Sequence, residues 1–150
     1  MRVLLTGSTG FIGKELDNFL KIKKCKVFYI GRKRNNNKNY YHFVSTDPEE
    51  KLEKIIVKIK PHAIFHIAGM ISSDSIEKSI NANVILTMKI LLALKNLRLL
   101  NKIKILVSGS ASEYGFVDKK NMPINESTSL KPNNIYGLTK YLQYKFCKGY

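Results

Sequence analysis

The chain is short of acidic residues and of cysteine, and both shortages restrict what it can be. Eleven Asp and Glu face 26 Lys and Arg, so the formal net charge is +15. The only cysteines, Cys25 and Cys147, lie far apart with no C-x-x-C spacing, which argues against a disulfide framework and a metal site. His62 and His66 also lack a second ligand at metal-binding spacing. We therefore expect reduced thiols, no bound metal and a cytoplasmic protein.

Long hydrophobic runs are missing as well. No apolar run reaches the roughly 18 residues of a membrane-spanning helix, and the short apolar stretch after Arg2 is too small for a signal peptide. The chain has 150 residues, of which 44% are hydrophobic, and a mean hydropathy of −0.18. These values predict one globular domain with a hydrophobic core and no membrane partner.

The excess of positive charge suggests a polyanionic partner, but its distribution does not support one. The lysines are spread along every segment, and no aromatic strand of an RNA-binding module occurs. Asparagine is abundant too, as at 35–37. A compositional bias toward Lys and Asn explains the charge more simply than nucleic-acid binding, so we expect no specific nucleic-acid partner.

Apolar stretches alternate with helical patterns joined by short connections, which is typical of βαβ units. Strands are expected at 2–6, 27–30, 41–44, 63–68 and 103–107, the fourth being buried on both faces. Helices are expected at 11–24, from Pro48 with Asp47 as N-cap, within 76–100 and at 136–148. Right-handed crossovers place the strands in the order 3-2-1-4-5, an α/β doubly wound parallel sheet of the Rossmann type.

Three glycines separate the first strand from the first helix. Glycine permits a tight turn and lets the backbone approach a pyrophosphate, whose charge is favoured at a helix N-terminus. The spacing is G-x-x-G-x-x-G rather than G-x-G-x-x-G, and an ordinary strand-to-helix turn is the alternative. The turn predicts a dinucleotide site formed by Gly7, Thr9, Gly10, Phe11, Ile12 and Gly13.

Ligands of doubly wound sheets bind at the carboxyl ends of the strands, where the strand order reverses. Gly7, Ala68 and Ser108 follow the first, fourth and fifth strands, so we expect them to border one crevice. The long irregular segment 109–135 comes next, and loops of that length in compact domains are usually functional.

Candidate catalytic residues lie at the two ends of that segment. Tyr136 and Lys140 are four residues apart in the last expected helix, so they share one face. A lysine ammonium lowers the pKa of a nearby phenol, which then exchanges a proton with a substrate hydroxyl while hydride moves to or from a nicotinamide. Ser110 would hydrogen-bond the same substrate oxygen.

Together these motifs resemble the extended short-chain dehydrogenase/reductases of the NAD(P)-dependent epimerase/dehydratase family. The resemblance rests on residues 6–13, 66–69, 83–87, 110, 114–115, 123–126 and 132–140, with Leu86 where the family usually has glycine. It implies a catalytic set of Ser110, Tyr136 and Lys140. It also implies that the cofactor is contacted by Ala68, Asn83, Ser108, Tyr136 and Lys140.

The resemblance implies hydride-transfer chemistry on a nucleotide-diphosphate sugar. In the family's 4,6-dehydratases an acidic pair follows the catalytic Ser or Thr, whereas here Ala111 and Ser112 occupy those places and Glu113 comes one position late. A 4-epimerase or 4-keto-reductase is therefore favoured over a 4,6-dehydratase. A catalytically silent dinucleotide-binding protein is a further alternative, which leaves Ser110, Tyr136 and Lys140 unexplained.

The end of the second strand bears on the choice of cofactor. An acidic residue there would bind the ribose 2′-hydroxyl of NAD, but the sequence has Gly31 followed by Arg32, Lys33 and Arg34. Arg32 with a basic neighbour suits a 2′-phosphate, so NADP is favoured and NAD remains possible. The resemblance places Asp47 at the adenine, and one carboxylate could also cap the helix.

The resemblance also predicts the organisation of the protein. Residues 1–150 would be the NAD(P)-binding Rossmann domain, incomplete at its C-terminus, with the family's C-terminal substrate domain absent from this chain. Family members pair two helices across a two-fold axis, which predicts a homodimer through about 79–100 and 136–150.

Overall fold

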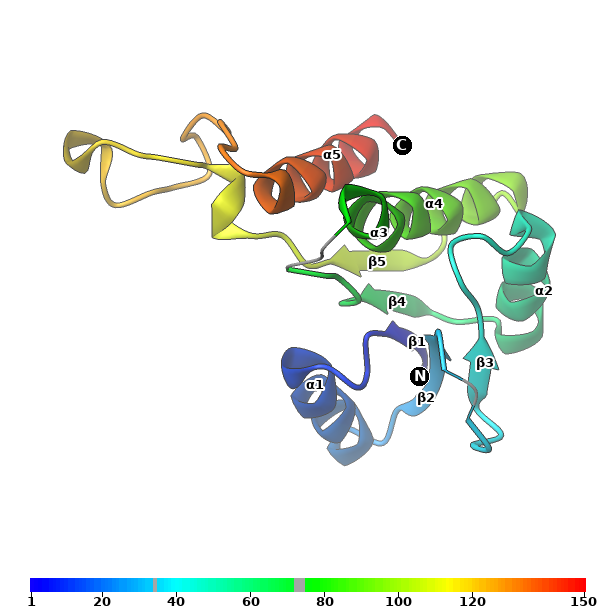
Figure 1. Cartoon of the computed structure of the whole chain (residues 1–150). Helices are drawn as coiled ribbons and strands as arrows, with labels where there is room; N and C mark the ends of the chain where they lie inside the picture. Colours follow the sequence, from blue (N-terminus) through cyan, green and yellow to red (C-terminus); the bar gives the residue numbers. More distant parts are fainter. Residues whose placement is uncertain (34, 72–74) are drawn as a thin grey trace.

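The computed structural model describes residues 1–33, 35–71 and 75–150. A five-stranded sheet with the order β3-β2-β1-β4-β5 forms its centre, and every neighbouring pair is parallel (Figure 1). This confirms the predicted Rossmann-type fold. The strands are β1 (Arg2–Thr6), β2 (Lys26–Gly31), β3 (Tyr40–His42), β4 (Ala63–His66) and β5 (Lys104–Val107).

Helices lie on both faces of this sheet, with α1 on one face and α2 and α4 on the other; α5 packs outside α3 and α4 (Figure 1). The helices are α1 (Phe11–Ile22), α2 (Glu49–Ile59), α3 (Ile76–Ile80), α4 (Leu86–Asn96) and α5 (Ile135–Gly149). A π-helical turn, η1 (Asn81–Ile85), joins α3 to α4, and two 3-10 turns, η2 (Ala111–Glu113) and η3 (Lys119–Asn121), lie in the segment before α5. The predicted helix within 76–100 is therefore three helical pieces in succession.

Alternation along the strands creates two hydrophobic clusters, because successive side chains of a strand point to opposite faces. Leu4 and Ile64 pack against α2 and α4 in the larger cluster, whereas Val3 and Leu5 pack with Leu20 of α1 in the smaller. All five side chains are buried. The sheet is thus fixed from both sides, and the carboxyl ends of its strands share one edge.

The smaller cluster does not cover its whole face of the sheet. An open apolar groove of about 470 Å³ lies beside α1, lined mainly by Phe11, Ile12, Leu16, Phe19, Phe65, Ile67 and Leu106. Phe65 is consequently only partly buried, so the prediction that the fourth strand is buried on both faces is wrong for this residue. The reason is that α1 packs over β1 and β2 and leaves β4 and β5 less covered.

The predicted N-cap of α2 is also wrong. Pro48 occupies the N-cap position with an extended backbone (ψ 149°), and the helix begins at Glu49. The Asp47 carboxylate instead accepts hydrogen bonds from Val44 N and Lys51 Nζ, both at 2.8 Å. Asp47 lies one residue too early to cap the helix, so its side chain closes the preceding turn.

Among the residues that the structure describes, no helix combines the length and the apolar character needed to cross a membrane.

Candidate active site

The glycine turn between β1 and α1 is tightly packed at two of its three glycines. Gly7 has φ +75°, and a Cβ there would lie 2.6 Å from Ala68 N. A Cβ at Gly13 would lie 2.0 Å from the carbonyl oxygen of Gly7. Both distances are far below van der Waals contact, so the packing of α1 and β4 against the turn requires glycine at both positions.

Gly10 differs from the other two. A Cβ there would meet no atom nearer than 3.4 Å, and its φ of −77° suits any residue. The fold itself does not need this glycine, whose surface is exposed. A small residue here keeps open the space directly in front of α1.

The N-terminus of α1 suits an anion. Gly10 is its N-cap, no side chain caps it, and its first turn contains no acidic residue. By contrast, Asn134 caps α5 by accepting a hydrogen bond from Gly137 N at 2.7 Å. The first N–H groups of a helix need partners, and its positive end favours negative charge. A pyrophosphate in front of Gly10 would meet both demands.

The ends of β1 and β4 are joined at this edge. Thr6 Oγ1 accepts a hydrogen bond from Ala68 N at 3.2 Å, and the main chain of Gly7 packs against Ala68. Thr9 is exposed in the same turn. The structure therefore brings Gly7, Thr9, Gly10 and Ala68 together.

Ser110 is held by a reciprocal cap. It is the N-cap of η2, where its Oγ accepts a hydrogen bond from Ser112 N at 3.2 Å. Glu113 Oε1 in turn accepts from Ser110 N at 2.7 Å, and Glu113 is only 6% exposed. Because a hydroxyl can both donate and accept, Ser110 keeps its proton for a further partner.

Tight packing brings the start of α5 to this turn. A Cβ at Gly137 would lie 2.3 Å from the carbonyl oxygen of Ser112, so the helix backbone rests directly on η2. Tyr136, which precedes Gly137, is partly buried. Ser110 and Tyr136 thus lie on two elements that pack against each other.

Lys140 is almost fully buried, with 2% of its surface exposed. Its Nζ donates hydrogen bonds to the carbonyl oxygen of Ser108 and to Gln143 Oε1, which ties α5 to the end of β5. Burial lowers the pKa of Lys140, an effect opposed by the negative charge of Glu113. An ammonium has three protons, and the third has no hydrogen-bond partner within the described parts of the chain.

A buried polar chain behind Lys140 was missed by the sequence analysis. It runs from Gln143 through Thr87 and His66 to Thr6, with every side chain at most 1% exposed. Burial, and secondarily the charge of Lys140, lowers the pKa of His66 to about 3. The one available signal was the position of Gln143, about one helical turn after Lys140.

Both polar atoms of the Asn83 side chain form hydrogen bonds within the protein. It is fully buried, with Oδ1 accepting from Met70 N at 2.7 Å and Nδ2 donating to Met70 O and to Thr139 Oγ1, both at 2.9 Å. These bonds fix the segment after β4 against α5. The structure thus gives Asn83 a role in shaping the edge of the site.

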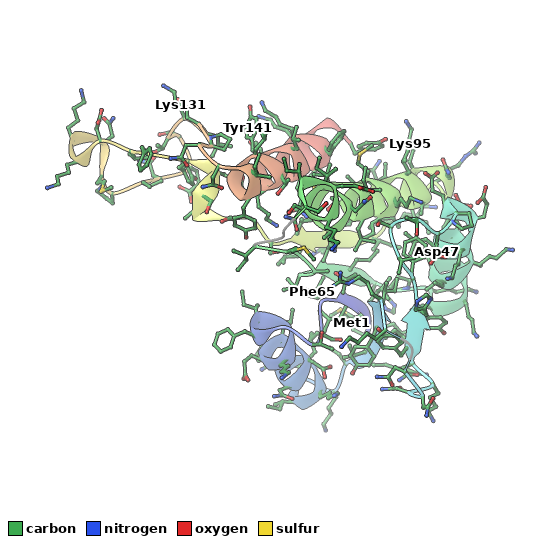
Figure 2. The ribbon with its side chains drawn as sticks, viewed as in Figure 1. Met1, Asp47, Phe65, Lys95, Lys131 and Tyr141 are labelled. Carbon is green, nitrogen blue, oxygen red and sulfur yellow. The ribbon has the colours of Figure 1, made fainter. Side chains whose placement is uncertain are left out.

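The remaining predicted cofactor residues are more dispersed. Arg32 is exposed just after β2, whereas Arg34 lies outside the described residues. Asp47 lies beside α2 and α4, at the opposite side of the view from α1 (Figure 2). Phe11 and Ile12 are 90% and 61% exposed and border the apolar groove.

Comparison of the sequence with those of known proteins finds epimerases and dehydratases. The chain is 26% identical to UDP-glucose 4-epimerase 2 of Arabidopsis thaliana, over 97% of this chain and 46% of the relative. It is 27% identical to GDP-mannose 4,6 dehydratase of Homo sapiens, over 94% of this chain and 43% of the relative. The chain therefore spans about half the length of the curated relatives it matches.

Solved structures give the same result. UDP-glucose 4-epimerase from Bifidobacterium longum, in complex with NAD+ and UDP, superposes with a TM-score of 0.82 at 26% identity, over 99% of this chain and 48% of that one. UDP-N-acetylglucosamine 4-epimerase from Bacillus cereus superposes with a TM-score of 0.83 at 23% identity, over 100% and 50%. Residues 3–150 match the family described as NAD dependent epimerase/dehydratase. The chain belongs to the NAD-dependent epimerase/dehydratase family.

Proposed function

We propose that this chain binds NAD(P) at the N-terminus of α1 and carries the proton relay of an epimerase or 4-keto-reductase acting on a nucleotide-diphosphate sugar. The observation that carries the proposal is Gly10, the one glycine of the turn that the packing of the protein does not require. It lies before a helix end without a side-chain cap. The related epimerase from B. longum was solved with NAD+ and UDP, which supports the same ligand classes here.

The proposed relay assigns one task to each side chain. Tyr136 exchanges a proton with the reacting sugar hydroxyl, and Ser110 donates a hydrogen bond to the same oxygen. Lys140 places a positive charge in the low-dielectric interior, where it stabilises negative charge on that phenol or on the cofactor. Bound NAD(P) would supply hydride transfer, taking up and returning the hydride in an epimerase or, in its reduced form, delivering it to the keto group in a 4-keto-reductase.

Glu113 favours epimerase or reductase chemistry over dehydration. Elimination of water needs its own acid and base, and Glu113 is the nearest carboxylate after Ser110 in the chain. That carboxylate is buried and accepts the N–H of Ser110. GDP-mannose 4,6-dehydratases nevertheless occur among the relatives, so a 4,6-dehydratase is the second candidate.

We further propose that NADP is preferred over NAD. β2 ends at Gly31, and the exposed Arg32 and Lys33 follow without a carboxylate. A guanidinium pairs strongly with a phosphate. The substitution Arg32→Ala should weaken NADPH binding roughly tenfold, the loss of one charge-assisted hydrogen bond, and leave NADH binding within about twofold.

Calorimetric titration of the wild type and Arg32→Ala with NADPH and NADH measures this difference. Lys38→Ala, in the exposed loop between β2 and β3, is the matched control and should bind both cofactors as the wild type does. If NADH binds the wild type at least as tightly as NADPH, the cofactor preference is wrong. If neither binds, the proposed function itself fails.

A homodimer is proposed through the helices at about 79–100 and 136–150. Leu138 and Leu142 lie one turn apart on α5 and are substantially exposed, as is Ile80 at the end of α3. An apolar stripe of this kind is stabilised by burial against a second copy. Sedimentation at micromolar concentration should show a dimer, and a single monomeric species would contradict this.

A further inference from the structure

Gln143 connects Lys140 to the core of the domain. Its side chain is 1% exposed, its Oε1 accepts a hydrogen bond from Lys140 Nζ, and its Nε2 donates to Thr87 Oγ1 at 2.7 Å. The reverse amide orientation would direct an NH₂ group at an ammonium, so the charge of Lys140 fixes which way the amide points. The carbonyl oxygen of Gln143 therefore faces Lys140 and accepts its hydrogen bond.

The hydrogen bonds of Thr87 determine which ring nitrogen of His66 carries the proton. Its hydroxyl donates to the main-chain oxygen of Asn83 at 3.0 Å, so the same oxygen must accept from Gln143 Nε2 and from His66 Nε2, the latter at 2.9 Å. His66 therefore carries its proton on Nε2. A neutral imidazole fits the pKa of about 3 that burial gives it.

This series of hydrogen bonds ends at Thr6 and Ala68, at the proposed cofactor edge of the sheet. With its proton on Nε2, His66 uses Nδ1 to accept from Thr6 Oγ1 at 2.7 Å, and Thr6 Oγ1 accepts from Ala68 N at 3.2 Å. Each side-chain nitrogen and oxygen of this series has at least one hydrogen-bond partner, and no buried side-chain N or O atom of the described residues lacks one. A fully satisfied buried network is rigid.

We propose that Gln143 is a positioning residue that holds the Lys140 ammonium at the end of β5, where the proposed proton relay needs it. The inference rests on the proposed function for its catalytic meaning, but its geometry is independent of any ligand. Two acceptors from different elements, Ser108 O on the sheet edge and Gln143 Oε1 on α5, define the place of Nζ. Without Gln143, one of the two is lost.

The charged groups around Lys140 make an amide the suitable partner. Burial lowers the pKa of Lys140, the carboxylate of Glu113 on η2 opposes that effect, and His66 on β4 is neutral. A neutral carbonyl holds the ammonium without adding a second buried negative charge. A carboxylate at position 143 would form an ion pair with Lys140 and neutralise the positive charge that acts on the reacting groups.

Lysine side-chain NMR on the full chain tests the inference without needing turnover. Carbon-13 labelling at Cε allows the Lys140 resonance to be titrated, with Lys140→Arg used to assign it. We expect Gln143→Met to lower the pKa of Lys140, because an acceptor for the charged form is lost, and Gln143→Glu to raise it. Asn101→Met, at an exposed amide in the turn before β5, is the matched control and should change nothing.

Cofactor binding provides the second readout. Gln143→Met should bind NADPH roughly tenfold more weakly, as for a lost hydrogen bond to a charged group. An unchanged Lys140 pKa in folded Gln143→Met, or in Gln143→Glu if the methionine variant does not fold, would overturn the positioning role. If the wild type binds neither cofactor while its Lys140 pKa still responds to Gln143, then the proposed function fails and the positioning role stands.

Discussion

Tyr136→Phe should reduce turnover of a nucleotide-diphosphate sugar by about 10³-fold, within the usual contribution of a general acid or base. The substitution removes one oxygen from a partly buried ring at the start of α5, where Gly137 fixes the helix on η2. Packing should survive, since the ring itself is kept. NADPH affinity should stay within about threefold of the wild type, because the cradle at α1 is untouched.

The measurement compares rates of conversion of the sugar that the wild type accepts from a panel of nucleotide-diphosphate sugars. Tyr144→Phe, at an exposed position of the same helix, is the matched control and should retain full turnover. Normal turnover by Tyr136→Phe would remove this residue from the chemistry and with it the proposed relay.

Acid should destabilise the folded chain through His66. Its folded pKa of about 3 lies below its ordinary value of 6.5, so between these values the unfolded chain binds a proton that the folded chain does not. The free energy of unfolding then falls as pH falls, by up to about 1.4 kcal/mol for each pH unit in that window. Above about pH 6.5 this contribution to stability is complete.

Urea denaturation at several pH values between about 4 and 7 measures the slope. Because carboxylates also titrate at the acid end, the decisive quantity is the difference between the wild type and His66→Gln, whose slope should be clearly shallower. Asn101→Gln, at an exposed and non-titrating position before β5, is the control and should keep the wild-type slope. Equal slopes for the wild type and His66→Gln would mean that His66 is not held neutral in the folded chain.

The sheet and its order could be predicted because the necessary information is local. Each strand is a short apolar run between helical patterns, and the handedness of crossovers then leaves few topologies. Boundaries were less accurate: β4 ends at His66, so Ile67 and Ala68 of the expected strand lie beyond its end. The cap of α2 failed because Pro48 itself takes the extended N-cap position.

The polar interior could not be predicted, because it depends on residues far apart in the chain. Gln143 and Thr87 are separated by 56 positions, and Thr6 and His66 by 60. The sequence around one member of each pair does not indicate the other member. Asn83 was selected by resemblance alone, and only the structure shows that its amide is bonded to Met70 and Thr139.

The structure also changes the argument from the glycine turn. Three glycines suggested a phosphate cradle, yet Gly7 and Gly13 are required by the packing of the domain itself. Only Gly10 remains without a structural requirement. The case for a ligand therefore depends on this one position, together with the missing side-chain cap of α1.

Titration of Gly10→Ala with NADPH is accordingly the most direct test. The added methyl group would lie 3.4 Å from the nearest atom of the protein, so stability should change by less than about 1 kcal/mol. Gly149→Ala, where a Cβ meets nothing within 4 Å, is the matched control. The account predicts cofactor binding at least roughly tenfold weaker in Gly10→Ala and unchanged in Gly149→Ala, whereas equally tight binding by wild type and Gly10→Ala would contradict it.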